Sequence, residues 1–171
     1  QLPDFQRGWV WDDEHIRSLL TSIARAFPVG AVMLLENGGD ARFKVRPIEG
    51  IETAKATPEK VEKLVLDGQQ RLTSLTQVLM LDRPVQTRDD KKREMKRYYY
   101  FDIEKALKGQ EQYGDAIFGV DEDRKIRENF GRDIKLDLAS PQQEYDNFCF
   151  PCNQILNSDT WEEGLNTSHP E

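Results

Sequence analysis

Residues 64–72 read Leu-Val-Leu-Asp-Gly-Gln-Gln-Arg-Leu, and this stretch decides how the first half of the chain folds. A short apolar run typical of a strand stops at Asp67 and Gly68, and a helical pattern with leucines on one face follows over residues 69–80. A glycine at a strand-to-helix turn lets the backbone approach a ligand closely, because it has no Cβ. The following helix directs its first N–H groups and its positive dipole end at the same point.

The side chains of this turn suit an anion, most often phosphate. Arg71 adds a fork of N–H donors that can grip phosphate at two points. The alternative is an ordinary turn in which Asp67 caps the helix while Gln69 and Gln70 face water. The turn is not a Walker P-loop, since no glycine in the chain is followed by lysine. Residue chemistry alone leaves both interpretations open.

Two further stretches carry candidate binding groups. Residues 3–7 read Pro-Asp-Phe-Gln-Arg, and two tryptophans follow them. We expect these aromatic side chains to pack on the next helix, whereas Gln6 and Arg7 are ligand-binding candidates if the loop folds over the 67–71 turn. Residues 27–30, Phe-Pro-Val-Gly, end that helix in a sharp turn.

The mixture of elements predicts an α+β fold. Amphipathic helices are expected over residues 13–26 and 69–80 among several short strands, and no regular β-α-β-α alternation is present, so a doubly wound parallel sheet is not expected. The weaker patterns predict a buried strand at 31–35, strands at 98–103 and 117–120, helical stretches near 104–108 and 123–130, and a last helix from Thr160. Residues 88–97 are expected to be helical or mobile.

Composition bounds the class of protein. The 171 residues suit one domain, taken as a fragment of a longer protein, with a motif-bearing core at 1–81 and a less regular α/β extension at 82–171. Hydrophobic residues make up 37% and charged residues 32%, and no apolar run approaches the ~18 residues of a membrane helix. We therefore expect a cytoplasmic protein without a membrane partner.

Charge is unevenly distributed. The net charge of −7 argues against a surface that attracts DNA broadly, but residues 83–97 hold seven basic side chains against three acidic ones. Any contact with double-stranded DNA should therefore be local. The basic run 88–97, followed by three tyrosines, would hold the phosphate backbone while the tyrosines stack on bases. The alternative is an ordinary solvated face, with the tyrosines in an amphipathic strand.

The two cysteines, Cys149 and Cys152, stand in the order Cys-Phe-Pro-Cys. A redox pair or half of a zinc site is one interpretation, but the remaining ligand candidates, His15 and His169, form no second pair at zinc-site spacing. We expect two half-buried thiols in a reducing compartment and no metal site built from them.

Two quoted stretches together resemble a known family. LPDFQRGWVWDDEHIRSLLTSIARAFPVG (residues 2–30) followed by LVLDGQQRLTSL (64–75) resembles the N-terminal domain of GmrSD-type restriction endonucleases, whose signature is Asp-Gly-Gln-Gln-Arg. The resemblance is close over residues 1–81. It is looser at YYYFDIEKAL and FPCNQIL, where Cys152 replaces an expected hydrophobic residue. That family is in turn similar to the ParB/sulfiredoxin fold, which implies a short mixed sheet with flanking helices around a nucleotide.

The resemblance implies a two-sided nucleotide pocket. One side is a polar box made of Gln6 and Arg7, and the other is a phosphate cradle made of residues 68–71. A proline turn, residues 28–30, lies near the base or ribose. The implied catalytic residues are Asp67, Gln69, Gln70 and Arg71, and the implied nucleotide-binding residues are Gln6, Arg7, Pro28, Val29, Gly30, Gly68, Thr73 and Ser74.

The resemblance also implies a role in defence against phage. The nucleotide would be a nucleoside triphosphate, with GTP favoured over UTP or CTP, accompanied by Mg²⁺. Modified phage DNA would be cut by a His-type nuclease domain elsewhere in the same or a partner chain, because this fragment has no His-Asn-His pattern. A homo-oligomer is a further expectation. Three roles stay open: a nucleoside triphosphatase, a nucleotide-gated sensor of modified DNA with little hydrolysis, or a scaffold with an eroded site, which the intact motif disfavours.

Overall fold

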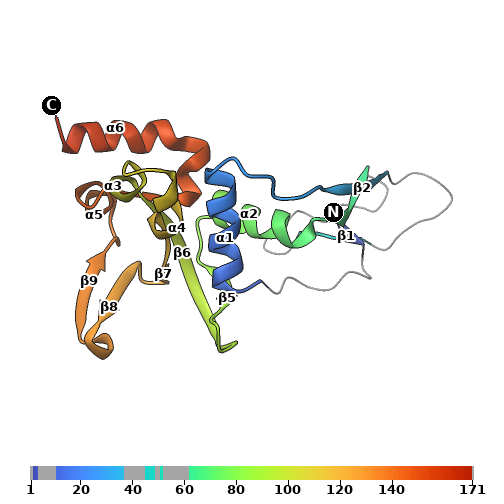
Figure 1. The fold of residues 1–171 in the computed structure, drawn as a ribbon, viewed down its shortest axis with the longest axis horizontal. Coiled ribbons are helices and arrows are strands. Elements are labelled where there is room, and N and C mark those ends of the chain that lie inside the picture. The colour runs from blue at the N-terminus through green and yellow to red at the C-terminus, as the bar shows by residue number, and fades with distance from the viewer. Residues whose placement is uncertain (1, 4–10, 37–44, 49–50, 52–61, 171) are drawn as a thin grey trace.

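The computed structural model describes residues 2–3, 11–36, 45–48, 51 and 62–170. Helices and strands alternate irregularly along the chain, and the 3₁₀ turns are short (Figure 1). In chain order the elements are β1 (Leu2–Pro3), α1 (Asp13–Ala24), β2 (Met33–Glu36), β3 (Val45–Arg46), β4 (Lys63–Asp67), α2 (Gln69–Met80), β5 (Val85–Arg88), β6 (Glu94–Asp102), α3 (Ile103–Ala106), η2 (Gln110–Gln112), α4 (Tyr113–Ala116), β7 (Ile117–Asp121), β8 (Lys125–Glu128), η3 (Asn129–Gly131), β9 (Asp133–Asp137), α5 (Pro141–Asp146), β10 (Cys149–Pro151), η4 (Cys152–Asn157) and α6 (Ser158–Ser168).

The long strand β6 organises the largest sheet. Arg97 pairs with β5 and with β7, and Tyr100 pairs with β7 and with β10. A residue with two partners has one on each side, so β7 lies along one edge of β6 while β5 and β10 follow each other along the opposite edge. The other described strands form two-stranded ribbons, β1–β3, β2–β4 and β8–β9.

The tyrosine run of β6 serves two separate cores, because successive side chains of a strand point to opposite faces. Tyr99 belongs to a core that α1, α2, β5 and β7 complete, with Phe101 packed against it. Tyr100 belongs to the other core, with Tyr98 packed against it and buried side chains from β7, β10 and the segment after β9. The alternation therefore determines which helices cover which face of the sheet.

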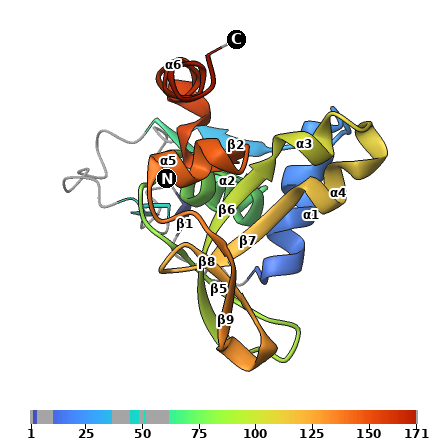
Figure 2. The same cartoon turned by 90° about the vertical axis from the view of Figure 1, so that its left-hand side faces the viewer.

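The first core is closed by α1, which packs along β7 (Figure 2). Asp12 caps the helix by accepting a hydrogen bond from the His15 backbone N–H at 2.9 Å. Asp13 accepts one from the Tyr99 hydroxyl at 3.0 Å and another from Arg17 Nε at 2.9 Å. The first turn of α1 is thus held to the central strand by a carboxylate.

A buried carboxylate, Glu144 of α5, closes the second core. Its Oε1 accepts hydrogen bonds from the Tyr100 hydroxyl at 3.0 Å and from Arg124 Nη1 at 3.2 Å, and its Oε2 accepts one from Trp161 Nε1 at 3.3 Å. Burial raises the pKa of Glu144, and the three donors act in the opposite direction. This one side chain joins α5, β6, α6 and the turn before β8.

Several sequence predictions are confirmed. The fold is α+β, α1 and α2 lie where periodicity predicts them, and β7, α3 and the last helix also form. Among the described residues no helix is long and apolar enough to cross a membrane.

Other predictions are wrong, each for a structural reason. The expected mixed sheet is instead a set of antiparallel pairings throughout the described strands. Residues 88–97 and 123–130 form strands and hairpin turns, with the short 3₁₀ turn η3 at one tip, and not α-helices. Cross-strand partners such as Asp137 of Lys125 pair with their charged side chains. The apolar run 31–35 is not buried, since it leads into an edge strand on which Met33 and Leu34 are at least half exposed.

Removing the Glu144 carboxylate should destabilise the fold strongly. We expect Glu144→Ala to lower the free energy of unfolding by about 3 kcal/mol, because it leaves buried donors of Tyr100 and Trp161 without an acceptor. Urea denaturation of the purified chain measures this. The matched control is Glu122→Ala, which removes an exposed ion pair with Lys96 and should change stability by less than about 1 kcal/mol. Equal effects of the two substitutions would contradict the assigned role of Glu144.

Candidate functional site

The turn between β4 and α2 depends on Gly68. Its φ of +86° lies in the left-handed region, and a Cβ there would lie 3.1 Å from Val32 Cγ2 and 3.3 Å from Arg71 Nη2. Glycine accepts this conformation without strain. Gly68 is also the N-cap of α2 and provides no side chain to accept from the first-turn N–H groups. The positive end of the dipole of this twelve-residue helix therefore lies at the turn without a capping side chain.

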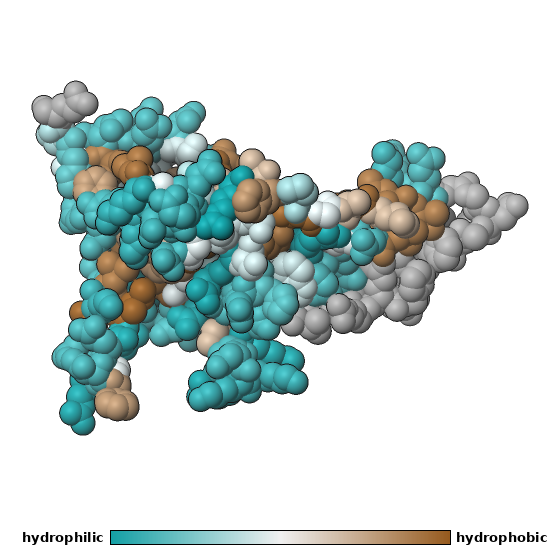
Figure 3. Space-filling model, in the orientation of Figure 1, coloured by the Kyte–Doolittle hydropathy of each residue, from teal (hydrophilic) through white to brown (hydrophobic). Residues whose placement is uncertain are grey.

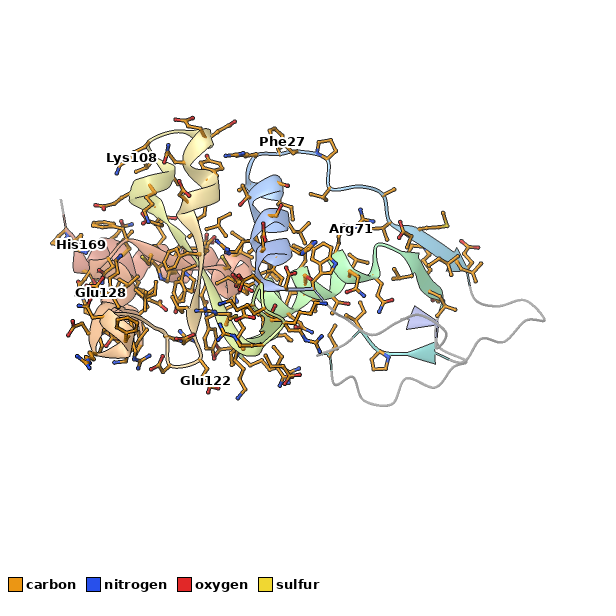
Figure 4. The ribbon with its side chains drawn as sticks, turned by 60° about the horizontal axis from the view of Figure 1, so that its bottom comes forward. Phe27, Arg71, Lys108, Glu122, Glu128 and His169 are labelled. Carbon is orange, nitrogen blue, oxygen red and sulfur yellow. The ribbon has the colours of Figure 1, made fainter. Side chains whose placement is uncertain are left out.

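Arg71 joins this turn to the segment that precedes β2 (Figure 4). Its Nη1 donates to the Val29 carbonyl oxygen at 2.5 Å, and its Nη2 donates to the Ala31 carbonyl oxygen at 2.7 Å. Residues 42 positions apart in sequence are thereby held together. The structure thus brings two of the three predicted stretches, 28–30 and 67–71, into direct contact.

Gly30 is required at the same contact. Its φ is +91°, and a Cβ added there would lie 1.9 Å from Arg71 Nη1. The glycine of the proline turn therefore provides the space that the guanidinium occupies. Sequence reasoning treated this glycine as a turn former and did not connect it with Arg71.

Arg71 keeps part of its donor capacity. Asp67 Oδ2 lies 3.5 Å from Nη2, and the Arg71 side chain is 22% exposed whereas that of Asp67 is 71% exposed. A guanidinium has five N–H groups. Among the contacts between described residues, Nε–H and one Nη1–H of Arg71 have no acceptor. The arginine is thus fixed by backbone carbonyls and still has donors for an anion.

The remaining predicted residues of α2 differ in exposure. Gln70 is partly exposed, whereas Gln69 is buried and Thr73 and Ser74 are completely buried. Ser74 Oγ donates to the Gln70 carbonyl oxygen at 2.9 Å, and Thr73 Oγ1 has no hydrogen-bond partner among the described residues. The leucine face predicted for this helix is only partly buried, whereas several of its polar side chains are buried.

The polar box of Gln6 and Arg7 lies outside the described residues. Within the described part of the chain, no three His, Cys, Asp or Glu side chains come together as a metal site. The side chains placed at the turn with solvent access are therefore Asp67, Gln70 and Arg71.

A groove of about 760 Å³ lies at the opposite end of α2, beside the β5–β6 hairpin. It is lined by Trp11, by Gln77 of α2 and by both strands of the hairpin, and no residue of the 67–71 turn reaches it. Gln77 stands nine residues beyond Gly68, about 13 Å along the helix axis. The lining holds three basic and three acidic side chains, from Arg83, Arg88, Lys96, Glu94, Asp121 and Glu122. Its balanced charge does not favour a polyanion inside the groove itself.

The basic run 88–97 forms the tip and arms of the β5–β6 hairpin. Most of its cations face acids, in the pairs Arg88–Glu94 (3.8 Å), Arg93–Asp89 (2.5 Å), Lys96–Glu122 (2.8 Å) and Arg97–Asp121 (3.0 Å). Lys91 and Lys92, in the turn, have no ion pair with any described residue. Asp121 at the end of β7 and Glu122 directly after it reduce the local positive charge, which the linear sequence does not reveal.

The tyrosines after this run are not available for stacking on bases as predicted. Tyr99 and Tyr100 are buried in the two cores, and Tyr98 lies under the Arg124 guanidinium, 4.3 Å from its ring centroid. The prediction of base stacking by Tyr99 and Tyr100 is wrong, because a central strand of a covered sheet buries both of its faces.

The cysteines are free, and both are buried rather than half-buried as expected. Burial raises the pKa of the Cys149 and Cys152 thiols to about 12. A thiol with so high a pKa is a poor nucleophile at neutral pH. Both residues serve packing: Cys152 belongs to the first core and Cys149 to the second.

Comparison with known proteins adds three findings. The family model described as "GmrSD restriction endonuclease, N-terminal domain" matches residues 1–162. An uncharacterized protein of Methanocaldococcus jannaschii is 42% identical over 77 residues, a match that covers 43% of this chain and 13% of that protein. No solved structure matches. The likeness to ParB and sulfiredoxin therefore stays an expectation.

Gly30→Ala should disrupt the contact with Arg71. We expect it to lower the free energy of unfolding by about 2 kcal/mol, from left-handed backbone strain and from displacement of the guanidinium. Thermal unfolding measures the change. Gly114→Ala is the control, because a Cβ at Gly114 meets nothing within 4 Å.

A double-mutant cycle separates the two causes. In an Arg71→Ala background, Gly30→Ala should cost only the backbone strain, about 1 kcal/mol. The same cost in both backgrounds would show that the guanidinium does not occupy the space beside Gly30.

The thiols should react slowly in the folded protein. With a pKa of about 12 in place of about 9, the thiolate fraction at pH 8 falls about a thousandfold. A disulfide reagent that releases a coloured thiol should therefore label both cysteines rapidly in guanidinium and hardly at all in native buffer. Rapid native labelling of either thiol would contradict its burial.

Proposed function

The chain belongs to the family of GmrSD restriction endonuclease N-terminal domains, and on that premise we propose that it binds and hydrolyses a nucleoside triphosphate at the Gly68–Arg71 turn. Membership of this family supports a role for the chain in a restriction system. In our proposal, nucleotide turnover controls cutting of modified phage DNA by a His-type nuclease domain in the same or a partner chain. The protein would act in the cytoplasm, and a homo-oligomer fits this role.

One observation carries the proposal, namely the hydrogen bonds from Arg71 to the Val29 and Ala31 carbonyls. They place the proline turn beside the amino end of α2, as a two-sided nucleotide pocket requires. A phosphate at this end would meet the helix dipole and the two remaining Arg71 donors. Because the guanidinium is already held in place, little side-chain entropy is lost when an anion binds.

Exposure assigns different roles to the other motif residues. Gln70 is partly exposed and Gln69 is buried, so Gln70 is the better candidate to orient the attacking water. Asp67 is exposed beside Arg71 and would contact Mg²⁺ through water, with phosphate oxygens as the main ligands. Pro28 and Val29 would lie toward the base or ribose, and Gly68 toward the phosphates. GTP is the favoured nucleotide, with UTP and CTP as alternatives.

The buried residues Thr73 and Ser74 would support the pocket from behind. Neither exposes a side-chain atom in this structure, so contact with nucleotide would require α2 to shift. Gln6 and Arg7 would complete the pocket from its second side.

The alternative function is a nucleotide-gated sensor of modified DNA with little or no hydrolysis. Within residues 67–71 the only carboxylate is that of Asp67, and it is exposed. This favours the alternative, because phosphoryl transfer usually relies on firmly held metal ions.

Arg71→Ala tests the site. We expect it to weaken triphosphate binding at least tenfold in calorimetry with GTP, UTP and CTP, and to abolish hydrolysis in a phosphate-release assay with Mg²⁺. Arg25→Ala is the matched control, because Arg25 also donates to two backbone carbonyls, those of Gln110 and Glu111, both at 2.9 Å. It should cost similar stability and leave nucleotide binding intact.

The outcomes separate the two functions. Binding that depends on Arg71 without any turnover would favour the sensor. Equal nucleotide affinity in Arg71→Ala and Arg25→Ala would exclude the turn as the nucleotide site.

A further inference from the structure

Two hairpins extend from the same side of the molecule. We name residues 85–97, around the β5–β6 turn, the first prong, and residues 125–137, around the β8–β9 turn, the second prong. Both point the same way in the two ribbon views (Figures 1 and 2). Figure 3 shows them as separate, mostly hydrophilic projections with a hollow between them.

The tip of the second prong presents a bare aromatic ring. Phe130 is fully exposed, and its backbone is left-handed, with φ +59° and ψ +35°. Its neighbours Asn129 and Gly131 also have positive φ, at +51° and +85°. A bulky residue is strained in this conformation, and a fully exposed phenyl ring makes no packing contact that offsets the strain. The strained tip thus serves no packing role in the described structure.

Both tips carry cations that the fold does not neutralise. Lys91 and Lys92 on the first prong and Arg132 on the second have no ion pair with any described residue. The arms are neutralised instead, through pairs such as Lys125–Asp137 at 2.5 Å and Arg127 with Asp123. The acid at the tips without a described partner is Asp90, so the tips together are positive.

The prongs differ in charge from the rest of the chain. The first holds six basic and three acidic residues, and the second holds four basic and three acidic residues. The two prongs together have a net charge of +4, whereas the whole chain has −7. The residues outside the prongs therefore carry a net charge of −11. A polyanion approaching this protein is repelled elsewhere and attracted here.

We propose that the two prongs grip duplex DNA, with Lys91 and Lys92 on phosphates and Phe130 inserted between base pairs as a wedge. This inference rests on the proposed role in DNA restriction. An apolar side chain on a rigid hairpin unstacks a base step and kinks the duplex, and flanking cations hold the backbone in place. A protein partner would match the exposed ring but not the surplus cations beside it, which is why the charges favour DNA.

The test uses the 171-residue chain and a short duplex that contains 2-aminopurine, whose fluorescence rises on unstacking. Wild-type protein should raise the fluorescence, and Phe130→Ala should abolish the rise and weaken binding about tenfold. Phe130→Leu keeps an apolar wedge and should retain most of the signal. Leu107→Ala is the control, because Leu107 is another strongly exposed apolar side chain and lies after α3, outside both prongs and the nucleotide site.

Salt dependence separates the wedge from the cations. Replacing Lys91 and Lys92 together by alanine should reduce the slope of log affinity against log salt by about two. Phe130→Ala should leave that slope unchanged, because it removes no charge. Thermal unfolding should be unaffected by either change, since these side chains are exposed at a turn.

Two results would overturn the inference. One is a failure of the wild-type chain to bind the duplex at low salt, and the other is an equal loss of fluorescence in Phe130→Ala and Leu107→Ala. Nucleotide binding is measured without DNA. The effect of Arg71→Ala on nucleotide binding can therefore be interpreted even if the prong proposal fails.

Discussion

The two-residue repeat of strand β6 is the constraint on which the rest of the structure depends. Because neighbouring side chains point to opposite faces, Tyr99 and Tyr100 enter different cores. A buried tyrosine hydroxyl requires a partner, and each finds a carboxylate from a different helix, Asp13 of α1 and Glu144 of α5. Burial and these neighbouring acids raise the pKa of both tyrosines. One strand thereby attaches a helix to each face of the sheet.

Helix α2 connects this packed body to the candidate site. Its carboxyl half contributes Val78 to the first core, and its amino end meets the β2–β4 ribbon at Gly68. There the main connection is a single guanidinium that reaches two carbonyls across Gly30. The site therefore lies where α2 meets the β2–β4 ribbon, apart from the two tyrosine cores.

Cross-strand electrostatics decide where the basic run can act. Asp121 and Glu122 lie more than twenty residues from Arg97 and Lys96 in sequence, yet they pair with them across the sheet. The arms of the hairpin become nearly neutral, and the surplus charge moves to the tips. Phe130, which no periodicity marks, is presented at the second tip by three consecutive left-handed residues. Sequence patterns detect the cations but not which of them stay unpaired.

The sequence by itself determined the α+β class, the two main helices, the turn at Gly68 and the family, because these follow from local periodicity, capping and a contiguous motif. It also pointed to residues 28–30 and 67–71 as parts of one site. Tertiary structure alone decided that Arg71 is held by backbone carbonyls, that Gly30 makes room for it, and that β8 is a strand. These depend on partners distant in the chain, and a hydrogen bond across 42 residues leaves no local pattern in the sequence.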